Sequence, residues 1–579
     1  MENKYTQSYI KAKEEADNVD VLIRECIKNH QHFLVEAAAG SGKTYSLNST
    51  VDWLEKEKPL GLDRDGRKIA CITFTNIAVD VMRSRLPESS SVEPCTIHTF
   101  CWNLMQNFQE YLIKHVPDVI QSKRFDYSSV EIKRVLYDLG IRNYNPLDCS
   151  LSLYHEDVIK YFELMLDEKK FRRIIASIYP IILIDEYQDS DKRIISKFIK
   201  YFIDCDTRIR PIIGLFGDAW QCIYASLNGV GEIKCKNMQI INKNTNFRSY
   251  SSIVAMLNKI RSCQTQICSK EDEKEKGAVC LITCKEPELK RYQERFEKGD
   301  LEAGQLRTVI DDCSNKIESL TGVAPKILII THKIIARSLG FESFLETYGT
   351  DIFRDKDDPF FLYCKNTIEP IFCALYKNDP PALADALGIN KVIVRNKEDK
   401  KKWKLIYKSL KEAREGKLID LIEYCSKNEY GLIPQDDNVL ELLDLYKEDA
   451  SFSYREKRIE DILNIPYHEF LVANEYIDEK TFFSTEHGSK GDEFENVIFV
   501  INKGWNQYQY HKYFPFNQTN NDPSFIRNRN LFYVSSSRAI KRLFFLLTYD
   551  GGQEFENYLK DLSNGASYDY KNFLSLTHI

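Results

Sequence analysis

The chain has 579 residues, of which 43% are hydrophobic and 29% charged, and its formal net charge is −6. This length is too great for one hydrophobic core, so we expect several domains, and the acidic balance argues against broad, charge-driven coating of duplex nucleic acid. No run approaches the ~18 apolar residues of a membrane-spanning helix and the polar start is unlike a secretory signal, so we expect no membrane association and a cytoplasmic location.

The first predicted element is a strand at Phe33–Val35, followed by EAAAGSGKTYSL (Glu36–Leu47), which opens a helix. GSGKT after a buried strand is typical of a phosphate-binding loop, because small residues let backbone N–H groups approach phosphate oxygens at the positive end of a helix. Lys43 is predicted to reach the β- and γ-phosphates, and the Thr44 hydroxyl to ligate Mg²⁺. The residues predicted to hold the nucleotide are Ala39, Gly40, Ser41, Gly42, Lys43 and Thr44.

A second buried strand is predicted at Ile181–Ile184, a continuous apolar run that ends in Asp185 and Glu186. Adjacent carboxylates at the tip of a core strand repel each other unless a cation lies there. Asp185 suits Mg²⁺ binding, and Glu186 suits orienting or deprotonating the water that attacks the γ-phosphate. The alternative interpretation is a solvated acidic loop after a strand.

A third strand with a polar tip is predicted at Ile212–Phe216, which leads into Gly217–Tyr224, GDAWQCIY. The neutral amide of Gln221 can donate a hydrogen bond to a γ-phosphate and lose that bond after hydrolysis. Gln221 is therefore a candidate sensor of the nucleotide state.

The motifs, in their order along the chain, resemble those of the UvrD/Rep-like helicases of superfamily 1. The matches cover residues 33 to 547, and seven or more ordered motifs are far more specific than any one of them. The resemblance implies an α/β fold of two RecA-like P-loop NTPase cores with parallel sheets, each interrupted by a mainly helical insertion. Besides the phosphate loop, the matching segments are Thr73–Asn76, Thr96–Phe100, Asp185–Asp189, Gly217–Tyr224, Asn246–Ser249, Thr485–Phe494 and Tyr533–Ala539.

The motif order predicts the domain organisation. The first core is expected at residues 1–105 and 181–240, with its insertion at 106–180. The second core is expected at 241–350 and 475–579, with its insertion at 351–474. Within the first insertion Glu131–Leu136 has the pattern of an amphipathic helix, and in the second core Lys326–His332 looks like a strand.

The resemblance also implies that the two cores share one ATP and its Mg²⁺. Arg248 and Arg538 would reach the γ-phosphate from the second core, because a guanidinium stays charged and binds phosphate oxygens in a fork. Hydrolysis would then depend on closure of the cleft, which couples ATP to motion. Phe247 would lie against the adenine, and Glu493 would contact the ribose. The implied catalytic set is Lys43, Glu186, Gln221, Arg248 and Arg538.

Nucleic-acid contacts are implied for both cores, since proteins that hold single strands combine backbone contacts with aromatic platforms. For His98 and Phe100 the alternative is a place in the hydrophobic core. Among several departures from the family, Ala225–Leu227 replaces an aromatic residue flanked by arginines, and Leu22 stands where relatives have an adenine-reading glutamine. We therefore expect ATP turnover with weaker processive unwinding. The implied contacts are Phe74, Thr75, Asn76, His98, Phe100, His487 and Ser489.

The compact size and small second insertion look more like the helicase-like subunits of Gabija anti-phage defence systems, which work beside a separate Toprim-type nuclease, than like helicases with a fused nuclease domain. The first interpretation is an ATP-dependent, 3′-to-5′ helicase or translocase on single-stranded or tailed DNA, which acts with such a nuclease in anti-phage defence or DNA repair. The alternative is a nucleotide- and DNA-sensing subunit that activates or assembles the nuclease with little unwinding. An RNA-directed helicase of the same superfamily is disfavoured by Asp185–Asp189 together with His487, Lys490 and Gly491.

Overall fold

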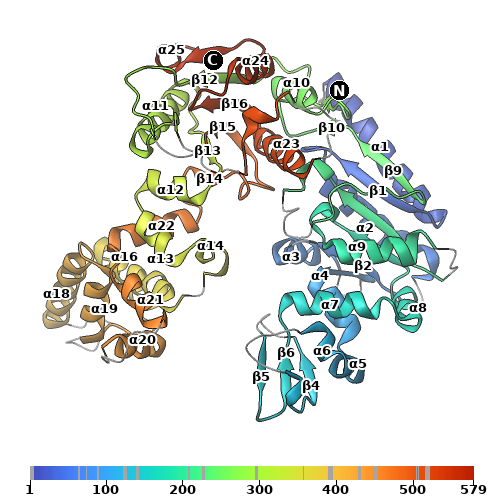
Figure 1. Cartoon of the computed structure of the whole chain (residues 1–579), viewed down its shortest axis with the longest axis horizontal. Coiled ribbons are helices and arrows are strands. Elements are labelled where there is room, and N and C mark those ends of the chain that lie inside the picture. Colours follow the sequence, from blue (N-terminus) through green and yellow to red (C-terminus); the bar gives the residue numbers. More distant parts are fainter. Residues whose placement is uncertain are drawn as a thin grey trace.

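Two α/β cores lie side by side in the computed structural model, and one insertion extends from each of them (Figure 1). Each core holds a six-stranded sheet in which all neighbouring strands are parallel, so the predicted α/β fold class is confirmed. Every helix within the described ranges is too short or too polar to span a lipid bilayer. The structure describes residues 6–62, 66–73, 75–87, 90–120, 127–137, 142–205, 209–223, 229–293, 298–356, 358–388, 396–427, 432–447, 454–503, 505, 507–515 and 522–578.

The first sheet has the strand order β3-β2-β7-β8-β1-β9. Its central strands β1, β7 and β8 are fully or largely buried, as expected for a parallel sheet covered on both faces, whereas half of the residues of the edge strand β9 are exposed. The strands are β1 (His32–Ala37), β2 (Ile69–Thr73), β3 (Val92–Thr96), β7 (Ile181–Ile184), β8 (Ile212–Gly217) and β9 (Met238–Lys243); the helices are α1 (Gln7–Lys28), α2 (Lys43–Glu57), α3 (Asn76–Arg83), α4 (Ile97–Met105) and α9 (Lys192–Phe198).

The second sheet has the order β14-β13-β15-β16-β12-β17. The strand predicted from Lys326–His332 is present as β13, and a helix begins at His332. The strands are β12 (Ala278–Thr283), β13 (Lys326–Ile329), β14 (Phe483–Thr485), β15 (Phe494–Ile501), β16 (Ala539–Leu547) and β17 (Ser567–Asp569); the helices are α10 (Ser251–Ile260), α11 (Ala303–Thr321), α12 (His332–Leu339), α23 (Pro523–Ser536), α24 (Gln553–Leu562) and α25 (Tyr570–Leu574). A two-stranded pair, β10 (Thr245–Asn246) and β11 (Ile267–Cys268), precedes them.

The first insertion carries a small sheet as well as helices. The helix predicted at Glu131–Leu136 is wrong: Arg134–Leu136 is strand β4, paired with β6 (Ser150–Ser152), which also pairs with β5 (Asn143–Asn145). Six residues are too few to separate a helical from a strand period, and the backbone N–H of Val135 donates to the side chain of Gln109. The helices are α5 (Gln109–Lys114), α6 (Val116–Val119), α7 (His155–Met165) and α8 (Lys169–Ile178).

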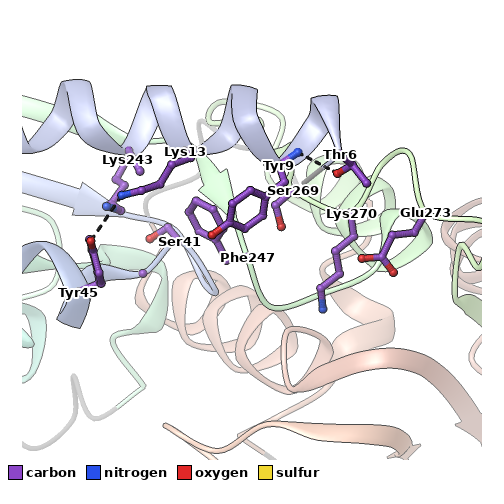
Figure 2. Close-up of a pocket in the computed structure, with 12 residues that line it drawn as sticks. Thr6, Tyr9, Lys13, Ser41, Tyr45, Lys243, Phe247, Ser269, Lys270 and Glu273 are labelled. Atoms are coloured by element: carbon purple, nitrogen blue, oxygen red, sulfur yellow. Dashed lines mark hydrogen bonds between the residues drawn. The ribbon is translucent and has the colours of Figure 1, made fainter. Parts of the chain in front are cut away.

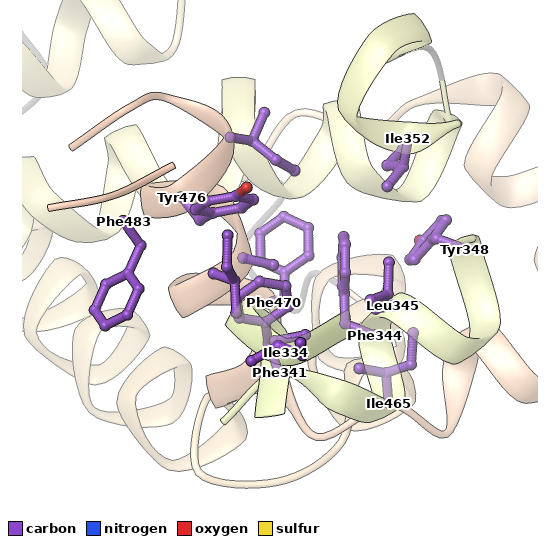
Figure 3. Packing of buried hydrophobic residues seen from close by; sticks show 14 of the residues in the cluster. Ile334, Phe341, Phe344, Leu345, Tyr348, Ile352, Ile465, Phe470, Tyr476 and Phe483 are labelled. Atoms are coloured by element: carbon purple, nitrogen blue, oxygen red, sulfur yellow. The ribbon is translucent and has the colours of Figure 1, made fainter. Parts of the chain in front are cut away.

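The second insertion is helical in its described residues and shares one apolar cluster with its core. Figure 3 shows Phe344, Phe470 and Tyr476 packed at the base of this insertion beside Ile334 of α12. The first core likewise shares a cluster with its own insertion. The helices of the second insertion are α13 (Glu342–Tyr348), α14 (Ile352–Asp355), α15 (Pro359–Tyr363), α16 (Glu369–Lys377), α17 (Pro380–Ala386), α18 (Lys397–Ala413), α19 (Leu418–Lys427), α20 (Asp437–Lys447), α21 (Tyr454–Leu463) and α22 (Tyr467–Ile477).

Apolar packing between the two cores is sparse by comparison. In the described part of the chain, the buried apolar clusters of the second core include Ala39, Trp220 and Ile223 as their first-core members. Each insertion is therefore tied to its own core, whereas the two cores meet mainly through polar contacts.

Candidate nucleotide-binding and catalytic site

The phosphate loop joins β1 to α2 and is shaped by two glycines. Gly40 and Gly42 have φ angles of +76° and +80°, a region that favours glycine. A Cβ at Gly40 would also lie 2.9 Å from Arg248 Cβ of the second core. Within the described ranges the buried Ser41 Oγ has no hydrogen-bond partner, so the loop offers an unused donor. This cradle at the start of α2 fits a phosphate group.

Lys43 lies against both strand-tip carboxylates. Its Nζ is 3.5 Å from Asp185 Oδ1 and forms an ion pair with Glu186. Burial alone would lower the pKa of Lys43, but Asp185 and Glu186 raise it above its ordinary value. The lysine is therefore a fixed cation at the point where a γ-phosphate would lie.

Glu186 is held as a carboxylate. Burial would raise its pKa, but Lys43 and Lys490 outweigh that effect and lower it to about 2. Glu186 has a φ of +49°, and Gln188 Nε2 donates to Glu186 Oε2 at 2.6 Å. A charged, oriented carboxylate is suited to position an attacking water.

The oxygen donors Thr44 and Asp185 fit a magnesium ion. Thr44 is exposed on the first turn of α2, and Asp185 pairs with the neighbouring Lys43. No cluster of three or more histidine, cysteine, aspartate and glutamate side chains that could hold a metal is found in the part of the chain that the structure describes. This sparse set suits Mg²⁺, which usually takes one or two protein ligands and completes its shell with water and phosphate.

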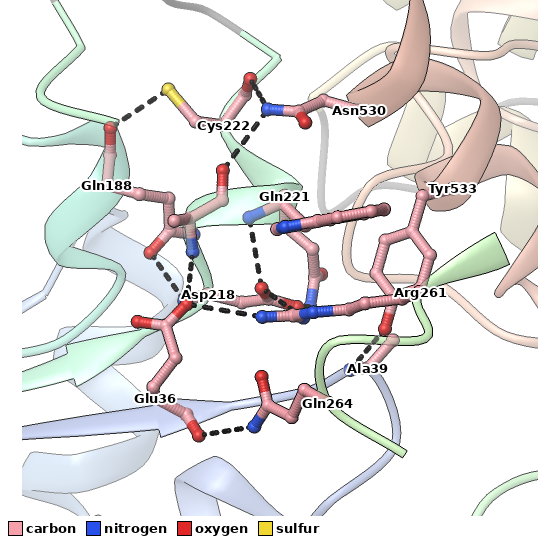
Figure 4. A network of polar contacts seen from close by, with 12 residues as sticks. Glu36, Ala39, Gln188, Asp218, Gln221, Cys222, Arg261, Gln264, Asn530 and Tyr533 are labelled. Atoms are coloured by element: carbon pink, nitrogen blue, oxygen red, sulfur yellow. Dashed lines mark hydrogen bonds and ion pairs between the residues drawn. The ribbon is translucent and has the colours of Figure 1, made fainter. Parts of the chain in front are cut away.

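Gln221 is oriented by a network that crosses between the cores (Figure 4). Its Nε2 donates to Asp218 Oδ2 at 2.8 Å. Arg261, at the end of α10, is 4% exposed, and its Nη1 lies 2.7 Å from Asp218 Oδ1 and its Nη2 3.4 Å from Glu36 Oε1. Asp218, which binds the candidate sensor Gln221, is thus also paired with an arginine of the second core. Sequence reasoning missed Arg261, which lies outside every matched motif.

Two further second-core side chains reach the strand tips of the first core. Lys490 Nζ forms an ion pair with Asp189 and donates to the carbonyl of Gln221 at 2.7 Å. Asn530 Nδ2 donates to the carbonyls of Ala219 and Cys222 at 3.1 and 3.0 Å. Both residues lie within or beside matched motifs, but the motifs alone assigned them no role.

The two predicted arginines are held by their own core. Arg248 Nε lies 2.6 Å from Glu493 Oε2. Arg538 is 1% exposed and donates to the carbonyls of Val534 and Asp492 and to Ser537 Oγ, at 2.9, 3.1 and 2.8 Å.

The charge around Arg538 nevertheless comes from both cores. Burial and the charge of Arg248 lower the pKa of Arg538 to about 9, and Asp492 and Glu186 act in the opposite direction. Arg538 therefore lies within electrostatic range of Glu186, but its guanidinium donates hydrogen bonds to carbonyls of the second core. Glu493, predicted as a ribose contact, forms the ion pair with Arg248 and is exposed.

A cavity of about 600 Å³ lies between α1, the phosphate loop and the segment after β9 (Figure 2). Phe247 lies in its wall, donates its N–H to the carbonyl of Gly40 at 2.9 Å, and has its ring centroid 6.0 Å from that of Tyr9. Leu22, the expected equivalent of the adenine-reading glutamine, is 43% exposed and is not among the lining residues. The lining is Thr6, Tyr9, Lys13, Ala16, Ser41, Gly42, Tyr45, Lys243, Phe247, Ser269, Lys270 and Glu273.

This cavity adjoins the phosphate loop and has the size of a nucleoside site. The part of α1 that forms its wall, residues 9–16, escaped the sequence interpretation because the family position expected on this helix was assigned to Leu22. The pattern that could have indicated it is the helical spacing of Tyr9, Lys13 and Ala16, which places all three on one face of α1.

Among the predicted nucleic-acid contacts of the first core, Phe74 lies outside the described residues. Thr75 and Asn76 are exposed at the start of α3, and Thr75 Oγ1 accepts from the N–H of Ala78 at 3.2 Å. His98 is partly exposed, and its ring centroid is 5.1 Å from that of His155. Thr75, Asn76 and His98 are therefore accessible to a strand.

Two of the predicted contacts have buried side chains in the structure. Phe100 is 1% exposed and packs on Phe162 and Tyr179, because it falls on the buried face of α4. Ser489 is fully buried and donates to the carbonyl of Glu486 at 2.9 Å. Neither side chain is exposed to contact a strand. His487 is partly buried and shares a hydrogen bond of 2.8 Å with the Tyr508 hydroxyl.

Comparisons with known proteins agree with the interpretation of the motifs. Residues 23–227, which span the phosphate loop, Glu186 and Gln221, match the family model described as an AAA domain. Gabija protein GajB of Bacillus cereus (strain HuB5-5) is 24% identical over 95% of this chain and 97% of its own length. The same protein of strain VD045 is 32% identical over 34% of this chain and 39% of its own.

A third relative is a subunit of the ATP-dependent helicase/nuclease of Anoxybacillus flavithermus, which is 35% identical over 14% of this chain and 8% of its own length. The resemblance to UvrD-like helicases and to Gabija helicase-like proteins is therefore confirmed.

Proposed function

We propose that this chain is an ATP-hydrolysing motor that moves 3′ to 5′ on single-stranded DNA and works in the cytoplasm with a separate Toprim-type nuclease in anti-phage defence or DNA repair. The observation that carries the proposal is the set of contacts that second-core side chains make at the strand tips of the first core. Lys490 and Arg261 reach Asp189 and Asp218, beside the phosphate loop and Glu186.

Each residue has a role in the proposed reaction. Lys43 and the N–H groups of the loop bind the phosphates, and Glu186 orients the attacking water and accepts its proton. Mg²⁺, bound through Thr44 and Asp185, would neutralise charge on the β- and γ-phosphates. Arg248 and Arg538 would exchange their present partners for γ-phosphate oxygens when the cleft closes.

The proposed coupling to motion follows from the network around Asp218. Gln221 is held by a carboxylate that also pairs with Arg261, so a shift of either core changes the position of the amide. Loss of the γ-phosphate would release contacts from both cores at once. Because few apolar side chains cross between the cores, a relative rotation disturbs little buried surface.

A second candidate function is a DNA- and nucleotide-sensing subunit that activates or assembles the nuclease with little unwinding. Ala225–Leu227, where relatives carry an aromatic residue flanked by arginines, favours it. The proposed partner and setting rest on the similarity to proteins named Gabija protein GajB.

Two assays on the purified full-length chain separate these functions. Phosphate release is measured with and without single-stranded DNA, and strand displacement is then measured on duplexes with a 3′ or a 5′ tail. DNA-stimulated turnover with displacement from the 3′ tail supports the motor. Stimulated turnover without displacement supports the sensor, and absence of turnover under all conditions rejects both.

A further inference from the structure

We propose that Trp505, Arg527 and Arg529 form a strand-binding track on the second core, which takes one base and two backbone phosphates of single-stranded DNA. This inference rests on the proposed function and names how the chain holds its strand. It assigns strand binding to residues of α23 and of the segment before it, because Ala225–Leu227 lack the aromatic residue and the arginines that relatives carry.

The first part of the track is an inter-core cavity of about 700 Å³ into which α23 contributes two arginines. Arg529 and Arg527 both line it, and the Arg529 guanidinium lies 3.9 Å from the ring centre of Trp220. Residues 222, 223 and 229–233 of the first core form the facing wall, next to the position where the family's cations and platform are missing.

The guanidinium groups of Arg527 and Arg529 on α23 are available to bind an anion. Arg261, the third arginine in the cavity, is paired with Asp218 and Glu36, and Glu232 is within 3.8 Å of Lys234. Within the described ranges neither Arg527 nor Arg529 forms an ion pair with a carboxylate. The hydrogen bonds of Arg529 go to the Asn530 amide oxygen at 3.1 and 3.0 Å.

Burial and the positive charge of Arg261 lower the pKa of Arg529 to about 10, and Glu232 and Asp218 act in the opposite direction, so the surroundings of Arg529 favour a further anion. A phosphodiester supplies that anion, and a guanidinium binds it with two parallel hydrogen bonds.

The track continues toward a predicted strand contact. Arg527 Nη1 donates to Gln507 Oε1 at 2.8 Å and also lines a second, polar cavity of about 350 Å³. Two residues before Gln507 is Trp505, which is 36% exposed, with its ring centroid 5.1 Å from that of Tyr508 and 6.1 Å from that of His487. An exposed indole beside His487 is a platform on which a base can stack.

Single-stranded DNA is the occupant that this arrangement fits. A single strand is held by cationic groups that contact its backbone and by flat side chains on which its bases stack, and Arg527, Arg529 and Trp505 provide both. The track also adjoins His487, the predicted strand contact of the second core. A duplex would demand a broad basic surface, whereas the chain carries a net charge of −6.

The test is anisotropy of a labelled oligothymidine of about 20 nucleotides, titrated with the full chain at several salt concentrations. Arg527→Gln and Arg529→Gln should each weaken binding and reduce the slope of log K against log salt by about 0.7. Trp505→Ala should weaken binding about 5- to 100-fold at an unchanged slope, because it removes a stacked base and no charge.

Arg173→Gln, an exposed arginine on α8, is the matched control and should keep the parental slope. Arg527→Lys and Arg529→Lys should restore the slope, which separates lost charge from a packing defect; melting temperatures check the fold of each variant. If the parent binds the oligonucleotide and both glutamine variants keep its slope, the track alone is refuted. If the parent does not bind the oligonucleotide, the proposed function fails and the track fails with it.

Discussion

The two cores have sheets of the same strand arrangement but different strand tips. In the order of each sheet, β1 lies between β8 and β9, and β12 lies between β16 and β17. After β1 the chain continues with Ala38–Gly42, whereas after β12 it continues with Cys284, Lys285 and Glu286. Topology gives both cores the same crevice at the carboxyl ends of their strands, and the side chains there decide which core holds the phosphates.

The second core contributes cations instead. Arg261 and Lys490 pair with carboxylates at the tips of the first sheet, and Arg538 lies within electrostatic range of Glu186. The proposed phosphate site would therefore be complete only when both cores meet. We therefore expect substitutions in the first core to abolish ATP binding or hydrolysis. Substitutions in the second core should remove the acceleration of hydrolysis that depends on closure of the cleft between the cores.

The largest effect is expected for Lys43→Ala, which should reduce ATP turnover to background because the buried cation at the phosphates is lost. The matched variant is Lys285→Ala, at the equivalent tip of the second sheet, where the lysine is exposed and paired with Glu556. Phosphate release measured for both should fall in the first variant and stay near the parental rate in the second. Equal losses would contradict the division of roles between the sheets.

Arg538→Ala should slow turnover by about 10³-fold or more, because an arginine supplied across a cleft stabilises the charge of the transition state. Nucleotide affinity, measured by titration with a fluorescent ATP analogue, should change much less. Since Arg538 is buried and makes three hydrogen bonds within its core, the melting temperature of the variant must be recorded. A parental rate in a folded variant would exclude Arg538 from the reaction.

Glu186→Gln should lower turnover by at least about 10²-fold while ATP binding is kept, because the amide cannot accept a proton from water. The measurements are single-turnover hydrolysis and nucleotide titration on the same preparation. Asp189→Asn is the control for loss of a neighbouring negative charge, and any effect on turnover should come from loss of the ion pair with Lys490. Hydrolysis at the parental rate in Glu186→Gln would mean that the assigned base is wrong.

The smallest effect concerns Glu486, a fully buried second-core carboxyl whose pKa is raised by burial from 4.5 to about 8. Between these values the folded state keeps the proton and the unfolded state has lost it, so stability falls as pH rises from 4.5 to 8, by up to about 1.4 kcal/mol per pH unit. Glu486→Gln, which cannot ionise, should gain stability relative to the parent between about pH 5 and pH 8. Urea unfolding of both proteins at about pH 5 and pH 8 measures the difference in their free energies of unfolding. If this difference is the same at both pH values, Glu486 is not protonated in the folded parent.

Local patterns were enough to locate much of the first core. β1, β7 and β8 follow from continuous apolar runs, since strands buried on both faces need no alternation. The small residues before Lys43 likewise required a close backbone turn. Short or mixed segments were not enough: Arg134–Leu136 is a strand because of its pairing with β6, and Phe100 is buried because α7 and the end of α8 cover it.

The sequence by itself determined which side chains stand at the strand tips, because periodicity and small-residue loops are local properties. The tertiary structure alone decided their partners: Arg261 on Asp218, Lys490 on Asp189, and Arg538 turned onto its own core. The first two pairings join residues that are far apart in the sequence, and their free energy depends on burial and distance, which no local pattern encodes.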